Sequence, residues 1–264
     1  MGFWQSIVLG IVQGISEFIP ISSSGHLVVL RAIMGIDEIP LLYDVVLHIA
    51  TLIVVVVFFR TRIGRMLVAV GRLIARRTTD EDAQDLKLAY LVVVGTGVTV
   101  VIALVIRQLD LHLYPRLVAV AFLATAAMLI LSHFTRPGIE YEGIGTRHAL
   151  VVGAVQGIAV IPGISRSGST IFAALASGVS RERAAEFSFL LSIPAIVGAL
   201  VLEMRDFGDL HAVVPPAAMA AGFVASLIFG FLSLSLLVRL VRGGRLWVFS
   251  IYLIPLGIWG LVAL

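Results

Sequence analysis

The sequence predicts an all-α polytopic membrane protein, with six transmembrane helices and two re-entrant helical hairpins in an inverted-topology repeat. The first observation is composition, since 59% of the 264 residues are hydrophobic and 13% are charged, whereas about a quarter of a soluble domain is charged. The second is that apolar residues are grouped into stretches long enough to cross a bilayer. The third is a polar phrase that occurs once in each half of the chain. A duplicated polar phrase in an apolar chain is where we expect the function to lie.

The apolar stretches define the predicted spans. A hydrocarbon core of about 30 Å requires roughly 20 residues of α-helix. Six stretches meet this requirement, and they lie at 41–59, 88–106, 117–134, 187–204, 213–238 and 246–264. The sequence contains no cysteine, which excludes disulfides and thiol catalysis.

The duplicated phrase reads GIVQGISEFIPISSSGH at 10–26 and GAVQGIAVIPGISRSGST at 153–170. The apolar segments beside each phrase are too short to span a bilayer. Irregular backbone at membrane depth is tolerated only where it is buried in protein or lines a water-filled cavity. We therefore predict re-entrant hairpins at 3–36 and 149–179, with both tips inside the protein.

Each half of this single membrane domain then holds one hairpin and three spans. Repeat one covers residues 1–137, and repeat two covers residues 147–264. Because three crossings are an odd number, the second half enters the membrane from the opposite side. In such inverted repeats, broken helices from the two halves meet near the bilayer midplane and form the site.

Lysines and arginines are concentrated in every second connection between the predicted membrane segments. Fourteen of them lie in alternate connections, which include 60–87 and the connection between the last two spans, and only four lie in the opposite connections. The positive-inside rule places the 60–87 connection in the cytoplasm and both termini outside the plasma membrane. We expect this connection to be a solvated amphipathic segment. The net charge of +3 therefore does not indicate a nucleic-acid partner.

The first copy of the phrase contains groups suited to acid–base chemistry. Gln13 and Glu17 are four residues apart, so a helix places them on one face. A carboxylate at membrane depth costs about 2.5–3.5 kcal/mol and should face a cation, a metal or water. Glu17, with Gln13 beside it, is the candidate ligand for a divalent cation such as Mg²⁺ or Ca²⁺. Ser23 is a candidate nucleophile, and His26 titrates near neutral pH and is a candidate general acid or base.

Both copies also contain the elements of an anion site. Serines at the start of a helix leave its N–H groups, and the positive end of its dipole, directed at a ligand. Arg166 in the second copy adds a planar guanidinium that suits phosphate oxygens. The residues predicted to bind a diphosphate in this way are Ser22, Ser24, Gly25, Ser165, Ser167, Gly168 and Thr170.

Structural interpretations of the same residues remain open. The serines can serve close helix packing, Glu17 and Arg166 can form a purely structural ion pair, and His26 can be a hydrogen-bonded interior histidine. Asp44 and His48, four residues apart on the first span, can face the cavity, although an interhelical hydrogen bond is the simpler interpretation. The sequence also leaves open whether Ser23 attacks the phosphate or a water held by Glu17 does so.

The two phrases resemble the signatures of the undecaprenyl pyrophosphate phosphatase family, also called the bacitracin-resistance protein family. QGISEFIPISSSGH matches the first signature, and PGISRSGST matches the second. Gln13 stands where many members have a second glutamate, while Glu17, Ser23, His26 and Arg166 occupy the family's functional positions. The resemblance implies a metal-dependent membrane hydrolase that removes the terminal phosphate of a C55 polyprenyl diphosphate. It also implies bacitracin resistance, because that drug sequesters the diphosphate.

Two functions follow from this pattern. The favoured one is a lipid-diphosphate phosphatase with a polyprenyl diphosphate and membrane lipids as partners, either as a monomer or as a homodimer. The alternative is a polyprenyl-phosphate transporter or flippase that uses the same anion site, since inverted repeats with sites at the midplane are a transporter architecture.

Overall fold

The computed structural model describes residues 1–36, 41–109, 115–203 and 214–263, and within these ranges the regular structure is helical. One isolated β-bridge joins Ile139 to Val179. The α-helices are α1 (Phe3–Phe18), α2 (Ser23–Ile33), α3 (Leu41–Phe58), α4 (Arg60–Ile74), α5 (Ala83–Arg107), α6 (Pro115–His133), α7 (Thr146–Ile158), α8 (Arg166–Ala176), α9 (Arg181–Glu203), α11 (Pro216–Arg242) and α12 (Ser250–Ala263). Short 3₁₀ turns lie at Asp80–Asp82, Tyr141–Gly143 and Leu246–Phe249.

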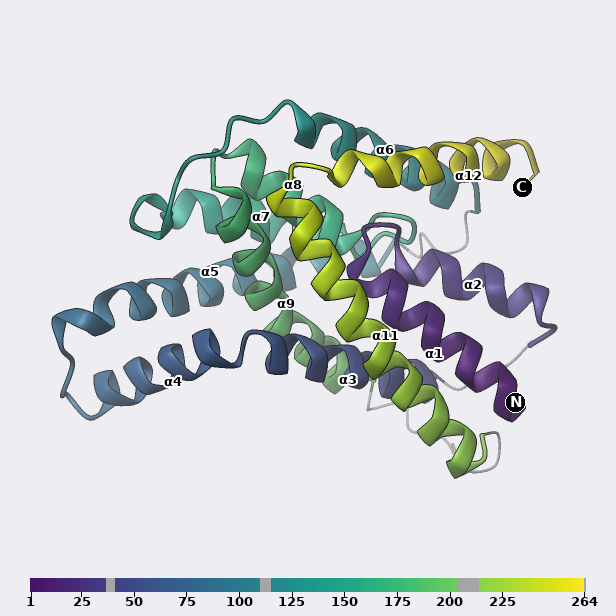
Figure 1. The fold of residues 1–264 in the computed structure, drawn as a ribbon, viewed down its shortest axis with the longest axis horizontal. Helices are drawn as coiled ribbons and strands as arrows, with labels where there is room; N and C mark the ends of the chain where they lie inside the picture. Colours follow the sequence, from purple (N-terminus) through teal and green to yellow (C-terminus); the bar gives the residue numbers. More distant parts are fainter. Residues whose placement is uncertain (37–40, 110–114, 204–213, 264) are drawn as a thin grey trace.

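Length and composition confirm the prediction of a polytopic membrane protein. Five helical segments in the described ranges are long and apolar enough to cross a bilayer, and they correspond to α5, α6, α9, α11 and α12. A sixth is obtained if α3 and α4, which meet at an angle of 79°, count as one broken span. The 60–87 connection thus contains a helix of its own, α4, which with α5 forms an arm that extends from the body of the molecule (Figure 1).

Several helices extend past the apolar stretches that the sequence marks. The predicted spans 88–106 and 187–204 correspond to helices that begin earlier, at Ala83 and Arg181, while α11 continues past 238 to Arg242. Hydropathy detects the apolar middle of a helix, whereas backbone hydrogen bonding continues into its polar ends. The predicted ends at 204, 213 and 264 lie outside the described residues.

Several helix contacts between the two halves have a counterpart between the equivalent helices. The first helix of each hairpin packs against a helix of the other half, α1 against α11 and α7 against α5. Likewise α3 packs against α11 and α9 against α5, while α6 and α12 lie side by side (Figure 1). Equivalent contacts of this kind are expected when the two halves are related by a two-fold axis. The inverted orientation of the repeats and the re-entrant nature of the hairpins stay predictions.

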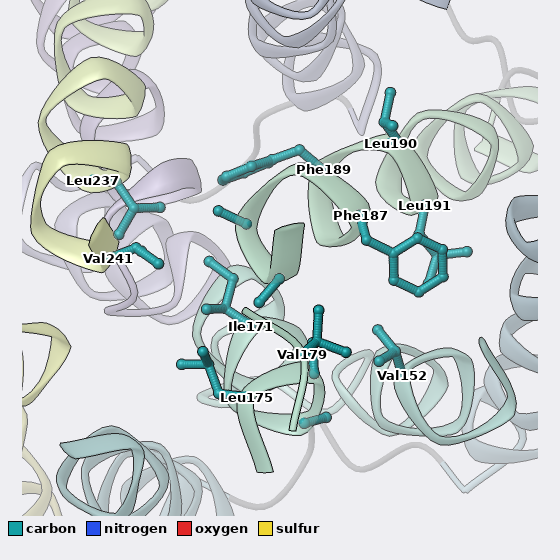
Figure 2. Packing of buried hydrophobic residues seen from close by; sticks show 14 of the residues in the cluster. Val152, Ile171, Leu175, Val179, Phe187, Phe189, Leu190, Leu191, Leu237 and Val241 are labelled. Carbon is teal, nitrogen blue, oxygen red and sulfur yellow. The ribbon is translucent and has the colours of Figure 1, made fainter. Parts of the chain in front are cut away.

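A hydrophobic core surrounds the second hairpin. Phe187 and Leu191 of α9 lie toward Val152 of α7, whereas Phe189 points to the other side of α9, where its ring meets Phe18 and Phe59 (Figure 2). These side chains of α9, Val152 and Ile171 of α8 are buried. The first hairpin has a smaller cluster of its own, made of Leu9, Leu27, Tyr43, Leu47, Val214 and Ala218. Because α8 is packed on several sides, its first residue is held in a defined place, and that residue is Arg166.

Glycines allow the crossing helices to approach closely. A Cβ atom added at Gly153 of α7 would lie 2.4 Å from the carbonyl oxygen of Gly95 in α5. At the corresponding crossing of α1 with α11, a Cβ at Gly10 would meet the backbone of Gly222. Small residues that permit such contact are typical of helix interfaces in membranes.

We expect Gly153→Ala to destabilise the protein, because the methyl group would force apart two backbones that no rotamer change can relieve. Overpacking of this kind costs about 1–3 kcal/mol. Gly97→Ala on the neighbouring helix is the matched control, since among the described residues no heavy atom outside the local backbone of its own helix lies within 4 Å of its added Cβ. Alanine also favours a helix over glycine. Loss of the helical circular dichroism signal on heating in detergent measures both. Equal midpoints for the two variants would show that the crossing tolerates a side chain.

Charged residues from four separate segments form ion pairs around the start of α9. Arg62 of α4 donates to Glu186 of α9 at 2.7 Å, and Arg183 donates to Glu140, in the connection after α6, at 2.8 Å. Arg242 near the end of α11 donates to Glu182 at 2.7 Å. The hydrogen bond from Arg183 lowers the pKa of the Glu140 carboxyl. These segments are the connections that the distribution of cations assigned to one side of the membrane.

Candidate active site

The first hairpin turns sharply between Phe18, which ends α1, and Ser23, which begins α2. Ser22 has φ of 71°, a left-handed conformation that is uncommon for residues other than glycine. Gly25 lies against Phe122 of α6, and a Cβ atom there would be 2.6 Å from the aromatic ring. The SSSG sequence therefore supplies a turn and a close contact as well as hydroxyl groups.

Glu17 is the centre of a buried polar cluster. Its Oε2 atom accepts hydrogen bonds from the Ser23 hydroxyl at 2.8 Å and from Gln13 Nε2 at 3.3 Å. Its Oε1 atom accepts one from Arg166 Nη2 at 2.5 Å. The side chains of Glu17 and Arg166 are 8% and 17% exposed. The structure thus brings together Gln13, Glu17 and Ser23 of the first phrase with Arg166 of the second.

The second hairpin places Arg166 through the cap of α8. Ser165 is the N-cap residue, and its hydroxyl accepts a hydrogen bond from the backbone N–H of Gly168. The Ser167 hydroxyl donates to the carbonyl of Phe18 at 2.9 Å and so joins the two tips directly. Side-chain capping satisfies helix N–H groups that would otherwise lack a partner.

The hydroxyls of the second phrase are engaged within the protein. Thr170 donates to the Arg166 carbonyl at 2.7 Å, and Ser165, Ser167 and Thr170 are all buried. Among the hydroxyls of the first phrase, Ser22 is also buried, whereas Ser24 is exposed and Ser23 is partly exposed. The predicted contacts of all these residues with a diphosphate stay predictions. The accessible polar side chains are those of Ser23, Ser24, His26 and Arg166.

Two buried polar atoms in this cluster have no hydrogen-bond partner among the described residues. They are Nη1 of Arg166 and Oε1 of Gln13. An unpaired buried polar atom costs free energy, so such an atom in a candidate site is available to contact water, an ion or a ligand. The guanidinium N–H groups suit an anion, and the amide oxygen suits a hard cation.

His48 of α3 also borders Glu17, with its Nε2 atom 3.8 Å from Glu17 Oε2. Its Nδ1 atom donates to the Asp44 carbonyl at 2.8 Å. Asp44 itself pairs with Arg31 of α2, so the expected interhelical bond exists for Asp44. For His48 the sequence favoured a hydrogen bond between helices, whereas the structure places its side chain next to Glu17. The available signal was its position, because an ionisable side chain inside an apolar span is a functional candidate by default.

His26 lies beside this cluster, and no hydrogen bond in the described ranges joins it to Glu17, Ser23 or Arg166. Its Nδ1 and Nε2 atoms are instead 2.8 Å from the Ser22 carbonyl and 2.7 Å from the Tyr252 hydroxyl. Tyr252 lies in α12 and belongs to neither phrase. Sequence reasoning missed it, because a tyrosine in an apolar span carries no local signal.

A cavity of about 260 Å³ lies elsewhere, where the bend between α3 and α4 meets α9 and α11. It is lined by Phe58, Phe59, Glu182, Ala185, Glu186, Ser235, Val238, Arg239 and Arg242. None of the predicted site residues lines it. The predicted catalytic residues Glu17, Ser23 and Arg166 instead lie together in the Glu17 cluster, where a carboxylate contacts both a hydroxyl and a guanidinium.

Comparison with known proteins agrees with the family resemblance of the two phrases. The model of the family described as bacitracin resistance protein BacA matches residues 6–259. An undecaprenyl-diphosphatase from Treponema denticola is 42% identical over 98% of this chain and 96% of its own length. Another from Desulfosudis oleivorans is 43% identical over 96% and 95%, and one from Borrelia recurrentis is 38% identical over 94% of each chain. With both hairpin tips and nearly the whole length inside the match, the chain belongs to the BacA bacitracin resistance protein family.

Proposed function

We propose that this protein hydrolyses undecaprenyl diphosphate to undecaprenyl phosphate and inorganic phosphate. This reaction recycles the lipid carrier for cell-wall glycan synthesis, and removal of the diphosphate confers resistance to bacitracin. The family and the names of the relatives support the proposal. The structural observation that supports it most is the hydrogen bond from Ser23 to Glu17 at 2.8 Å, beside the guanidinium of Arg166.

In this proposal each residue of the cluster has a role. Glu17 accepts a proton from the attacking group, which is either the Ser23 hydroxyl or a water molecule in its place. Arg166 holds the terminal phosphate, and its Nη1 atom, which has no hydrogen-bond partner in the part of the chain that the structure describes, is available for that contact. His26 exchanges a proton with the leaving lipid phosphate. A carrier would need the anion contacts of Arg166 but would gain little from a base beside a serine.

We also propose Mg²⁺ or Ca²⁺ as a cofactor. Two oxygen ligands come from the Glu17 carboxylate and from Oε1 of Gln13, which accepts no hydrogen bond from the described residues. The described residues contain no group of three or more histidine, aspartate, glutamate or cysteine side chains that could hold a metal. Mg²⁺ is commonly bound by one or two protein carboxylates together with substrate phosphates and water, so a sparse set of ligands fits it. The bound cation would neutralise phosphate charge during the reaction.

The location proposed is the plasma membrane, with the 60–87 connection in the cytoplasm and both termini outside. The cations of the alternate connections support this orientation. The ion pairs of Arg62, Arg183 and Arg242 around the start of α9 support placing these connections on the same side of the membrane. The isoprenyl tail would lie along exposed apolar helix faces. A homodimer stays a prediction.

The test is phosphate release by the purified protein in detergent. We expect inorganic phosphate to accumulate when undecaprenyl diphosphate is supplied with Mg²⁺ or Ca²⁺, and to stop accumulating when a chelator is added, because the diphosphate charge is then not neutralised. The Arg166→Ala variant, expressed and purified in the same way, measures phosphate release by contaminating phosphatases. If the lipid is recovered intact with either metal while reconstituted vesicles exchange it across the bilayer, the protein is a transporter.

A further inference from the structure

His26 is held in one protonation pattern by its two hydrogen bonds. A carbonyl oxygen can only accept, so the 2.8 Å contact with Ser22 requires a proton on Nδ1. In the neutral imidazole, Nε2 then carries the lone pair, and the Tyr252 hydroxyl at 2.7 Å must donate to it. Nε2 is therefore the nitrogen that can exchange a proton, and Tyr252 is its partner in the described structure.

Tyr252 also fixes the plane of the imidazole. The two rings are stacked, with centroids 5.6 Å apart and an interplanar angle of 29°. On another side, the Phe122 ring of α6 meets the imidazole edge-on, with centroids 5.8 Å apart. The imidazole thus has two aromatic neighbours and two hydrogen bonds, while it remains partly exposed.

The position of Tyr252 depends on the packing of α12 against α6. Gly257 and Gly260 of α12 lie against Ala119, where a Cβ added at Gly260 would be 2.9 Å from the Ala119 methyl group. The same helix, α6, carries Phe122. The second half of the chain thus supplies a residue to His26 of the first phrase, as it supplies Arg166 to Glu17.

We propose that Tyr252 is the positioning residue for His26, an inference that rests on the proposed phosphatase function. A phenol can donate to the neutral imidazole and accept from the protonated one. It can therefore hold the ring in the same orientation before and after Nε2 takes up a proton. Stacking keeps the ring plane fixed, so Nε2 stays directed at one place next to the serine-rich tip.

The test compares two substitutions that remove different parts of the Tyr252 side chain. Tyr252→Phe removes the hydroxyl and keeps the stacked ring, whereas Tyr252→Leu removes both. We expect kcat for phosphate release to fall about tenfold in Tyr252→Phe and about 100-fold in Tyr252→Leu, with KM within about threefold of wild type, because misdirected acid–base groups lose turnover before binding. The fall in kcat in His26→Asn is the largest fall that a substitution of Tyr252 can cause through His26. Tyr90→Phe on α5 is the matched control, since this phenol is exposed and makes no hydrogen bond in the described ranges.

A second readout does not depend on turnover. Nitrogen-15 NMR of histidine-labelled protein distinguishes protonated from unprotonated ring nitrogens, and His26→Asn identifies the His26 signals. Neutral wild-type His26 should have its proton on Nδ1, and the Nε2 resonance should shift in Tyr252→Phe but not in Tyr90→Phe.

The two proposals fail in different ways. An unchanged Nε2 resonance in Tyr252→Phe, an unchanged kcat in Tyr252→Leu, or a loss confined to KM would each overturn the role of Tyr252 while leaving the phosphatase intact. Absence of phosphate release by the wild-type protein would instead overturn the proposed function, and the NMR experiment would still test the contact.

Discussion

Replacing Glu17 with glutamine is expected to lower kcat for phosphate release by about 10²–10⁴-fold, the range attributed to a general base. The amide is nearly isosteric, and its oxygen can still accept a hydrogen bond from Ser23 or Arg166. It cannot take a proton from the attacking group, and it is a poorer ligand for a divalent cation than a carboxylate. The effect should therefore appear in turnover at saturating lipid and persist at high Mg²⁺ concentration.

Glu140→Gln is the matched control for this substitution. Glu140 also accepts a hydrogen bond from an arginine, Arg183, but it is 54% exposed and lies outside the hairpins. Its variant should retain wild-type activity, because an exposed ion pair contributes only about 0–1 kcal/mol. Wild-type turnover in Glu17→Gln would exclude Glu17 as the base and leave it with a structural role.

The fold could be predicted because its main signals are local. Hydropathy identifies apolar helices, and the duplicated phrase divides the chain into halves. The bend of 79° between α3 and α4 and the early start of α5 could not be predicted. Arg60 and Ala83 lie at polar ends of helices, where the sequence gives no apolar signal and tertiary contacts decide the backbone path.

The site could be predicted only where its residues lie on the duplicated phrase. The phrase predicts Glu17, Ser23 and Arg166 as candidate site residues, and the structure brings their side chains together. His48 and Tyr252 reach the same region from α3 and α12, and only the packing of those helices shows it. The sequence also could not show how the hydroxyls are directed, because capping of α8 and the contact between the tips compete with any ligand for them.

Arg166→Gln is expected to abolish phosphate release and also to destabilise the fold, because it leaves the Glu17 carboxylate buried without its guanidinium partner. Breaking a buried ion pair on one side costs about 3–5 kcal/mol. We expect a lower thermal midpoint by circular dichroism and loss of lipid diphosphate binding. Arg147→Gln, at an exposed arginine in the first turn of α7, should change neither.

The double variant Glu17→Gln with Arg166→Gln separates these two effects. Because both charges are then absent, no uncompensated ion stays buried, and replacing a complete buried pair is often close to neutral for stability. We therefore expect the thermal midpoint of the double variant to return most of the way to that of wild type, while phosphate release remains at background. A double variant as unstable as Arg166→Gln would mean that the guanidinium stabilises the tips through contacts other than Glu17. Recovery of phosphate release together with stability would mean that the pair is structural and that the reaction occurs elsewhere.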